Sequence, residues 1–306
     1  MTTATVRVPA KINLCLGVGA AREDGFHPLA TVYQAVDLHD EVRATSVDGD
    51  AITVQVHSEL DVRSESVVVP EDDTNLAVRA ARLLRDEVGD PELGVDLAIR
   101  KAIPVAGGMA GGSADAAAAL VACNEVWGLG LSKHELEPYA AEVGSDVPFL
   151  LHGGIAIGGG RGETVSPVLA RGSYHWVFAT AAEGLSTAAV FAEFDRLNEG
   201  VDVPEPTVPD GLMEALRAGD AYALGTHLSN DLTDAALSLR PELHRTLEVG
   251  REAGALGAIL SGSGPTALFL VTDEQHGLDV SIALGSASSC ADLIQSTGPV
   301  QGARLV

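Results

Sequence analysis

The sequence predicts an α+β protein built of two domains, and three observations support this prediction. The chain has 306 residues, of which 46% are hydrophobic, enough to bury two cores. Residues 104–114 form a glycine-rich loop between an alternating strand pattern and an apolar run that is typical of a buried helix. A second glycine loop, at 261–266, separates two short apolar segments that are typical of strands. A glycine-dense stretch at 153–162 precedes the expected boundary near residue 165, which gives domains 1–165 and 166–306.

The first domain is expected to open on strands. Thr3–Val8 alternates, and Pro9 should end that strand because proline lacks the backbone N–H that a ladder needs. Alternation resumes at once, which places Lys11 and Asn13 together on the polar face of a second segment. On this pattern alone, a solvated face is a better interpretation of the two side chains than a site.

A turn is expected at Asp24-Gly25, a pair that strongly favours turns, and it presents Phe26 beside His27. A lone histidine is more often structural than catalytic, and the phenylalanine could equally anchor a core, so both interpretations stay open. Further strands are expected at 31–38, 41–45 and 52–56, followed by an irregular connector at 59–73 with a short apolar run at 67–69.

Helix signals are clear in the middle of the chain. The apolar period of residues 75–88 predicts a helix that Thr74 can cap and that Gly89 ends. Ser132 followed three residues later by Glu135 is a capping-box pair, and it predicts the start of another helix.

The glycine-rich loop is the centre of the predicted site. Strand, glycine loop and helix together present backbone N–H groups and a positive helix end to a phosphate. Glycine leaves no side chain between the backbone and the anion. Ser113 is placed to cap the helix expected at 116–127 and to offer its hydroxyl to a phosphate or its metal. A flexible surface loop is the alternative, but flexible linkers are not usually followed by an apolar helix that must dock in a core.

Three familiar nucleotide-binding patterns do not match this loop. Gly107 and Gly112 have the spacing of a Walker A loop, but Ser113 stands where the lysine should be. The loop does not have the glycine register of the dinucleotide-binding fingerprint, and no suitable acidic residue follows it about twenty residues later. The protein-kinase motifs H-R-D and D-F-G are absent from the sequence. The loop is therefore predicted to bind phosphate in a different way.

Charge and cysteine content exclude other classes. The net charge of −24 argues against nucleic acid and anionic membrane surfaces as partners, so attraction of a phosphate must be local. No apolar run has the length of a signal or a membrane span, and we expect a cytoplasmic protein. Cys15, Cys123 and Cys290 share no metal spacing, and the first two lie in apolar segments, as small buried hydrophobes do.

The second half is expected to form a smaller α+β domain around the second glycine loop. Its predicted strands are 176–180, 258–260, 267–271 and 291–295. Its first predicted helix opens at 183–187 and runs to 197. The others are 211–216, 218–227, 240–253 and 279–284, with a proline-rich linker at 201–209.

Three motifs in order then carry a resemblance over essentially the full length. They are Pro-Ala-Lys-Ile-Asn-Leu at 9–14, the glycine loop with its following Asp-Ala at 104–116, and Gly-Ser-Gly-Pro-Thr at 262–266. In this order they resemble the GHMP kinase superfamily. The resemblance implies a two-domain GHMP kinase fold. The N-terminal domain would be α/β and ribosomal-protein-S5-like, the C-terminal domain α+β and ferredoxin-like, with the active site in the cleft between them.

Within the superfamily, the segments 24–27, 144–148 and 229–232 resemble one branch. Its members phosphorylate the 2-hydroxyl of a cytidine diphosphate sugar alcohol in the non-mevalonate route to isoprenoids. The resemblance implies ATP and Mg²⁺ as cofactors and this small molecule as substrate, with no nucleic-acid or membrane partner. A monomer or weak homodimer is expected. Ser113 is the one metal ligand that we would name.

The resemblance also assigns roles to individual residues. Lys11 and Asp146 would be the catalytic pair, although a structural salt bridge would explain the same two residues. Phe26 would stack on the cytosine and His27 would hydrogen-bond it, while Asn13 would hold the substrate near the reacting hydroxyl. Thr187 and Phe191 would line the other side of the substrate cleft. The loop that would wrap the ATP phosphates comprises Pro104, Val105, Ala106, Gly107, Gly108, Met109, Ala110, Gly111, Gly112, Ser113 and Ala114.

Two alternatives stay open. A kinase of the same superfamily for homoserine, mevalonate or a sugar would share the motifs, but a small acceptor has no base to stack on Phe26. A nucleotide-sensing module without turnover is the other, and the presence of both Lys11 and Asp146 argues against it. The branch usually has tyrosine in place of Phe26, and glycine and serine in place of Ala110 and Ala114.

Overall fold

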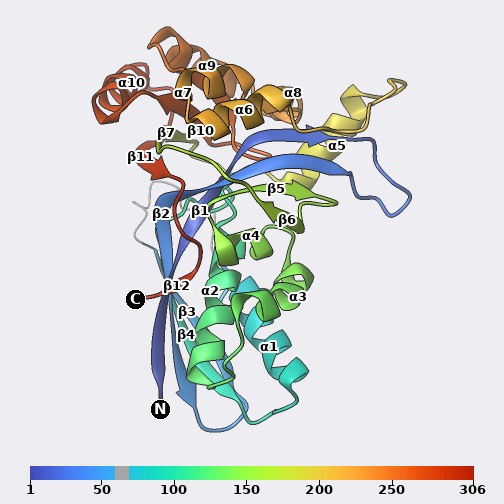
Figure 1. Ribbon diagram of the computed structural model, residues 1–306, viewed down its shortest axis with the longest axis vertical. Helices are drawn as coiled ribbons and strands as arrows, with labels where there is room; N and C mark the ends of the chain where they lie inside the picture. The colour runs from blue at the N-terminus through green and yellow to red at the C-terminus, as the bar shows by residue number, and fades with distance from the viewer. Residues whose placement is uncertain (59–68) are drawn as a thin grey trace.

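The computed structural model describes residues 1–58 and 69–306, and two sheets organise them (Figure 1). The expected connector at 59–73, with its apolar run, lies largely outside the described residues. The larger sheet contains β1 (Thr3–Val18), β2 (Leu29–Val47), β3 (Ile52–Ser58), β4 (Gly94–Lys101), β5 (Ile155–Gly159), β6 (Thr164–Pro167), β8 (Ser229–Asn230) and β12 (Arg304–Leu305). The smaller sheet has the antiparallel order β11 (Asp292–Gly298), β7 (Tyr174–Thr180), β10 (Ala267–Val271) and β9 (Gly257–Leu260).

Helices cover the two sheets at opposite ends of the molecule. Figure 1 shows α1 to α4 beside the long β1–β2 hairpin and α6 to α10 gathered at the other end. The helices of the first group are α1 (Leu76–Val88), α2 (Gly111–Val126), α3 (Lys133–Val143) and α4 (Val147–His152). Those that follow are α5 (Thr187–Leu197), α6 (Asp210–Ala218), α7 (Ala221–His227), α8 (Thr233–Leu239), α9 (Leu243–Glu252) and α10 (Glu274–Ser286).

The helix α2 is the central element of the first core. Its run from Ala114 to Cys123 is buried throughout, as expected of a helix that is apolar on all sides. It packs on β1 and β2 and against α1 and α4. This burial holds the first turn of α2, and with it the glycine-rich loop, against the sheet.

The predicted break at Pro9 is wrong. The strand β1 runs through it, with a register shift between Pro9 and Ala10 against β2. The unmatched residues of this bulge, Asp37 and Leu38, lie on β2, and proline is tolerated in a strand where a bulge interrupts the regular ladder. The strand β2 likewise runs unbroken where two strands were expected.

Helix caps confirm some of the local predictions and correct others. Gly89 ends α1 in the left-handed conformation, and Ser132 forms a capping box with Glu135. The N-cap of α1 is Asn75, one residue after the predicted Thr74. Helix α2 begins at Gly111, earlier than predicted, so Ser113 lies inside its first turn and caps nothing.

Short elements in the second half had no sequence signal. The helix α8 and the strands β8 and β12 were not predicted, and both strands join the larger sheet by pairing with β1. Near the chain's end, Ala303 is buried and its N–H donates to the Leu150 carbonyl. The chain first passes from the larger to the smaller sheet between Pro167 and Tyr174, and β8 and β12 later return to the larger sheet. The domain boundary near residue 165 stays a prediction.

A buried ion cluster joins the start of α2 to the larger sheet. The Lys101 ammonium donates to Asp40 and, at 2.8 Å, to Asp115 of α2, and all three residues are at most 3% exposed. The other Asp40 oxygen accepts from the backbone N–H groups of Ala102 and Ile103. Burial raises the pKa of the Asp115 carboxyl to about 8, although the Lys101 charge opposes the rise.

We predict that Lys101→Met lowers the free energy of unfolding by about 3–5 kcal/mol, because it leaves the Asp40 carboxylate buried without its cation. Denaturant unfolding at pH 7 measures the change. The control is Arg82→Met, which removes the exposed ion pair with Asp73 and should cost less than about 1 kcal/mol. Equal losses in the two variants would contradict the prediction.

Candidate active site

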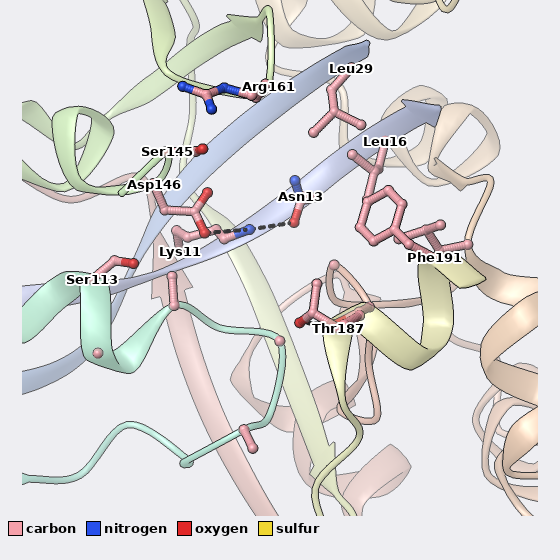
Figure 2. A pocket seen from close by; sticks show the side chains of 18 of the residues that line it. Lys11, Asn13, Leu16, Leu29, Ser113, Ser145, Asp146, Arg161, Thr187 and Phe191 are labelled. Carbon is pink, nitrogen blue, oxygen red and sulfur yellow. Dashed lines mark hydrogen bonds and ion pairs between the residues drawn. The ribbon is translucent and has the colours of Figure 1, made fainter. Parts of the chain in front are cut away.

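A cleft of about 910 Å³ brings the predicted site residues together. Figure 2 shows Lys11, Asn13, Asp146, Thr187 and Phe191 around it. Phe26 and His27 also line it, as do Pro104, Ala106, Gly107, Gly108, Ala110, Gly111, Gly112 and Ser113 of the loop.

Three residues of the predicted phosphate loop do not line the cleft. They are Val105, Met109 and Ala114. Met109 and Ala114 are fully buried, because their side chains pack in the core beneath the loop. The Met109 carbonyl still has a part in the site, since it accepts from the backbone N–H of Lys11 at 3.2 Å.

The first glycine loop lies directly on the second. Gly108 has φ +77°, and a Cβ built there would lie 2.0 Å from the Ser261 carbonyl oxygen. The Ser261 hydroxyl donates to the Gly108 carbonyl at 2.9 Å. Ala110 also adopts a left-handed backbone, φ 60°, so alanine keeps the loop geometry at a position where the family usually has glycine. The second loop therefore supports the first by backbone contact.

Lys11 is a cation of the cleft, and it is buried rather than solvated. Its side chain is 7% exposed, with Nζ 2.9 Å from Asn13 Oδ1, 3.5 Å from Asp146 Oδ2 and 5.2 Å from the ring centroid of Tyr33. The Asn13 amide donates in turn to the Thr31 hydroxyl at 2.8 Å, which sets its orientation. The predicted solvated face is wrong, because the glycine loop and α4 cover this side of β1.

Asp146 stands at the N-terminus of the short helix α4, with its side chain 27% exposed. Tyr33 lies beside it, and burial first, then the charge and a hydrogen bond of Asp146, raises the pKa of the Tyr33 phenol well above its ordinary value. The sequence interpretation missed Tyr33. Tyr33 pairs with Asn13 across β1 and β2, and that pairing could have indicated it. The register of the two strands cannot be read from the sequence, because bulges interrupt their pairing.

The turn between β1 and β2 forms the far wall of the cleft. Phe26 is half exposed, and the Arg161 guanidinium lies 4.8 Å from its ring centroid. His27 is buried, with Nε2 2.8 Å from Asp195 Oδ1 and its ring centroid 4.9 Å from that of Phe191. Arg161 and Asp195 were missed. A signal existed for Asp195, which follows Phe191 by one helical turn on α5.

The start of α5 also touches the second glycine loop. The Thr187 hydroxyl lies 2.9 Å from that of Ser263. One helix thus contacts both the phosphate side and the turn side of the cleft.

The described part of the chain contains neither a three-residue metal-ligand group nor a membrane-spanning helix. Among residues 1–58 and 69–306, there is no group of three His, Cys, Asp or Glu side chains arranged to hold a metal ion. In the same part of the chain, no helix combines the length and apolarity that crossing a membrane requires.

Comparison with known proteins identifies the class. Residues 75–154 match the GHMP kinases N terminal domain, and residues 212–287 match GHMP kinases C terminal. The chain belongs to the GHMP kinase family, which confirms the predicted superfamily and its two-domain fold.

Individual relatives narrow the class. The 4-diphosphocytidyl-2-C-methyl-D-erythritol kinase of Thermobifida fusca (strain YX) is 53% identical over 100% of this chain and 99% of its own. A crystal structure of 4-(cytidine 5'-diphospho)-2C-methyl-D-erythritol kinase is 30% identical, with a TM-score of 0.75 over 95% of this chain and 98% of that one. A homoserine kinase from Cytophaga hutchinsonii has a TM-score of 0.76 at 19% identity, over 100% and 98% of the two chains, a likeness of fold alone.

We predict that Gly108→Ala weakens binding of a non-hydrolysable ATP analogue at least tenfold, because its Cβ would overlap the Ser261 carbonyl and displace the loop. Calorimetric titration measures the affinity. Gly128→Ala is the matched control, since Gly128 has a similar φ of +65° but open space around it. Unchanged affinity in a folded Gly108→Ala protein would contradict the contact between the two loops.

Proposed function

We propose that this protein transfers the terminal phosphoryl group of ATP to the 2-hydroxyl of 4-diphosphocytidyl-2-C-methyl-D-erythritol, a step of non-mevalonate isoprenoid biosynthesis. One observation carries the proposal: Lys11 Nζ and Asp146 Oδ2 lie 3.5 Å apart in a cleft lined by the glycine loop and by the Phe26–His27 turn. The kinase of Thermobifida fusca, which is 53% identical over 100% of this chain, supports the cytidyl compound as the acceptor.

The proposed chemistry uses Asp146 as the base. Phosphoryl transfer needs positioning and neutralisation of charge, and the acceptor hydroxyl must lose its proton as its oxygen bonds to phosphorus. Asp146 is a carboxylate within the cleft that can orient the hydroxyl and accept this proton. Tyr33 lies beside Asp146 with its phenol pKa raised, so it keeps its own proton, and its hydroxyl donates to the Gly162 carbonyl at 3.5 Å.

Lys11 is placed to face the phosphoryl group during transfer. It adjoins Gly262 of the second loop, where a Cβ added to the glycine would lie 3.8 Å from the Lys11 Nζ. Its ammonium compensates negative charge on Asp146 and on the transferred group alike. The backbone N–H groups and the positive N-terminus of α2 supply the remaining attraction that a protein of net charge −24 needs locally.

Mg²⁺ fits this site as an ion held chiefly by the nucleotide. Such ions usually take one or two protein oxygens together with substrate phosphates and water, not an all-protein cage. This agrees with the lack of a three-residue ligand group among the described residues. The Ser113 hydroxyl lines the cleft on the first turn of α2 and would hold it (Figure 2). When bound, the ion would neutralise phosphate charge.

The acceptor assignment is tested by ADP release from ATP with alternative alcohols. We expect turnover with 4-diphosphocytidyl-2-C-methyl-D-erythritol and none with homoserine, mevalonate or galactose, because these small alcohols have no base to occupy the Phe26–His27 turn. Turnover with a small alcohol and none with the cytidyl compound would refute the proposal in favour of another GHMP kinase. ATP binding without turnover of any alcohol would favour a sensing module.

We predict that Asp146→Asn lowers kcat by about 10²–10⁴, the usual contribution of a general base, while the affinity for the ATP analogue stays near the wild-type value. Single-turnover rates and calorimetric titration measure the two quantities. A structural salt bridge with Lys11 would instead give a loss of stability with little change in kcat.

We predict that Phe26→Ala raises the KM for the cytidyl substrate about 10- to 100-fold and leaves the KM for ATP unchanged, because base stacking contributes about 1–3 kcal/mol. Phe26→Tyr is the control, since it keeps the stacking ring and should behave as wild type. Parallel rises in both KM values for Phe26→Ala would count against the turn as the base site.

A further inference from the structure

Three side chains of helix α5 contact the His27 ring. Its side chain is 6% exposed, and its Nε2 lies 2.8 Å from the Asp195 carboxylate. The ring centroid lies 4.9 Å from that of Phe191 and 5.9 Å from that of Phe194, the latter edge-on. Phe191, Phe194 and Asp195 occupy one face of α5, three and four residues apart. The imidazole therefore has one orientation relative to the cleft.

The partner at Nε2 decides where the ring proton lies. A carboxylate has only acceptor oxygens, so the hydrogen bond requires a proton on Nε2. A neutral imidazole then has a lone pair on Nδ1, and Nδ1 becomes an acceptor. Within residues 1–58 and 69–306, Nδ1 has no hydrogen-bond partner and is not among the polar atoms sealed from solvent. Because His27 and Asp195 both line the cleft, this acceptor is available to a ligand there.

We propose that Asp195 is a positioning residue that sets the Nε2–H tautomer of His27, so that Nδ1 accepts a hydrogen bond from the exocyclic amine of cytosine. Cytosine carries this amine as a donor, whereas uracil has an acceptor oxygen at the equivalent position, as thymine does. Two acceptors facing each other repel, so the tautomer selects a cytidine over a uridine compound. The inference rests on the proposed function, because it explains how that site chooses its base.

The kinetic arm compares cytidine and uridine forms of the diphosphate sugar alcohol in four proteins. Wild type should prefer cytidine by about 100-fold in kcat/KM, since a site with an unpaired acceptor rejects the wrong base. Asp195→Ala should raise the KM for the cytidine form about tenfold and lower the preference by a similar factor, with the KM for ATP unchanged. Asp195→Glu restores a carboxylate and should recover most of the preference. Glu199→Ala, an exposed charge beyond the end of α5, is the control and should match wild type.

The spectroscopic arm reads the tautomer directly. Histidine-ring ¹⁵N spectra at pH 8, with the His27 signals assigned by their absence in His27→Gln, should show a protonated Nε2 and an unprotonated Nδ1. Asp195→Ala should lose this pattern. A proton on Nδ1 of the wild type, as the other tautomer or an imidazolium, would overturn the inference. An unaltered base preference in Asp195→Ala would overturn it too.

The two proposals can fail separately. Binding of CDP and UDP is measured by titration, independent of turnover. If no alcohol is phosphorylated but CDP binds more tightly than UDP and Asp195→Ala removes the difference, the inference stands and the proposed function fails. If the cytidyl compound is phosphorylated but the wild type does not discriminate CDP from UDP, the function stands and the inference fails.

Discussion

A buried ammonium must be compensated where it lies, and Lys11 imposes that constraint on the whole cleft. Asn13 and Tyr33 solvate it from the β1–β2 hairpin, and Asp146 faces it from the start of α4. The backbone N–H of Lys11 donates a hydrogen bond to the Met109 carbonyl of the glycine loop. One residue of β1 thus sets the position of the charge and of the phosphate loop together, so neither can shift without exposing the other.

Backbone contact joins the two glycine loops next to Lys11. The Ser261 carbonyl lies too close to Gly108 for any Cβ there, and the Asn230 amide holds the second loop through the carbonyls of Leu260 and Gly262. Under the proposed function, close approach of backbone N–H dipoles would attract the phosphate although the protein has a net charge of −24. Beneath α2, the Lys101 ammonium donates to Asp115 of the helix and to Asp40 of β2. These buried ion pairs hold the start of α2 on the larger sheet.

Helix α5 contacts both the second glycine loop and the Phe26–His27 turn. Its first residue, Thr187, contacts Ser263 of the second loop, and Phe191 and Asp195 one and two turns later hold His27. Under the proposed function, a base on the turn and a nucleotide in the loops would therefore share one rigid support. Such support matters because phosphoryl transfer depends on alignment more than on covalent chemistry.

The sequence by itself determined the features that depend on neighbours along the chain. The three motifs, the Ser132–Glu135 capping box and the left-handed Gly89 were all evident, because caps, turns and apolar periods act over a few residues. Only the tertiary structure decided that Lys11 is buried, that Tyr33 stands beside Asp146 and that Asp195 meets His27. Those contacts depend on bulges, strand register and the docking of distant segments, whose energies arise only when the chain closes on itself.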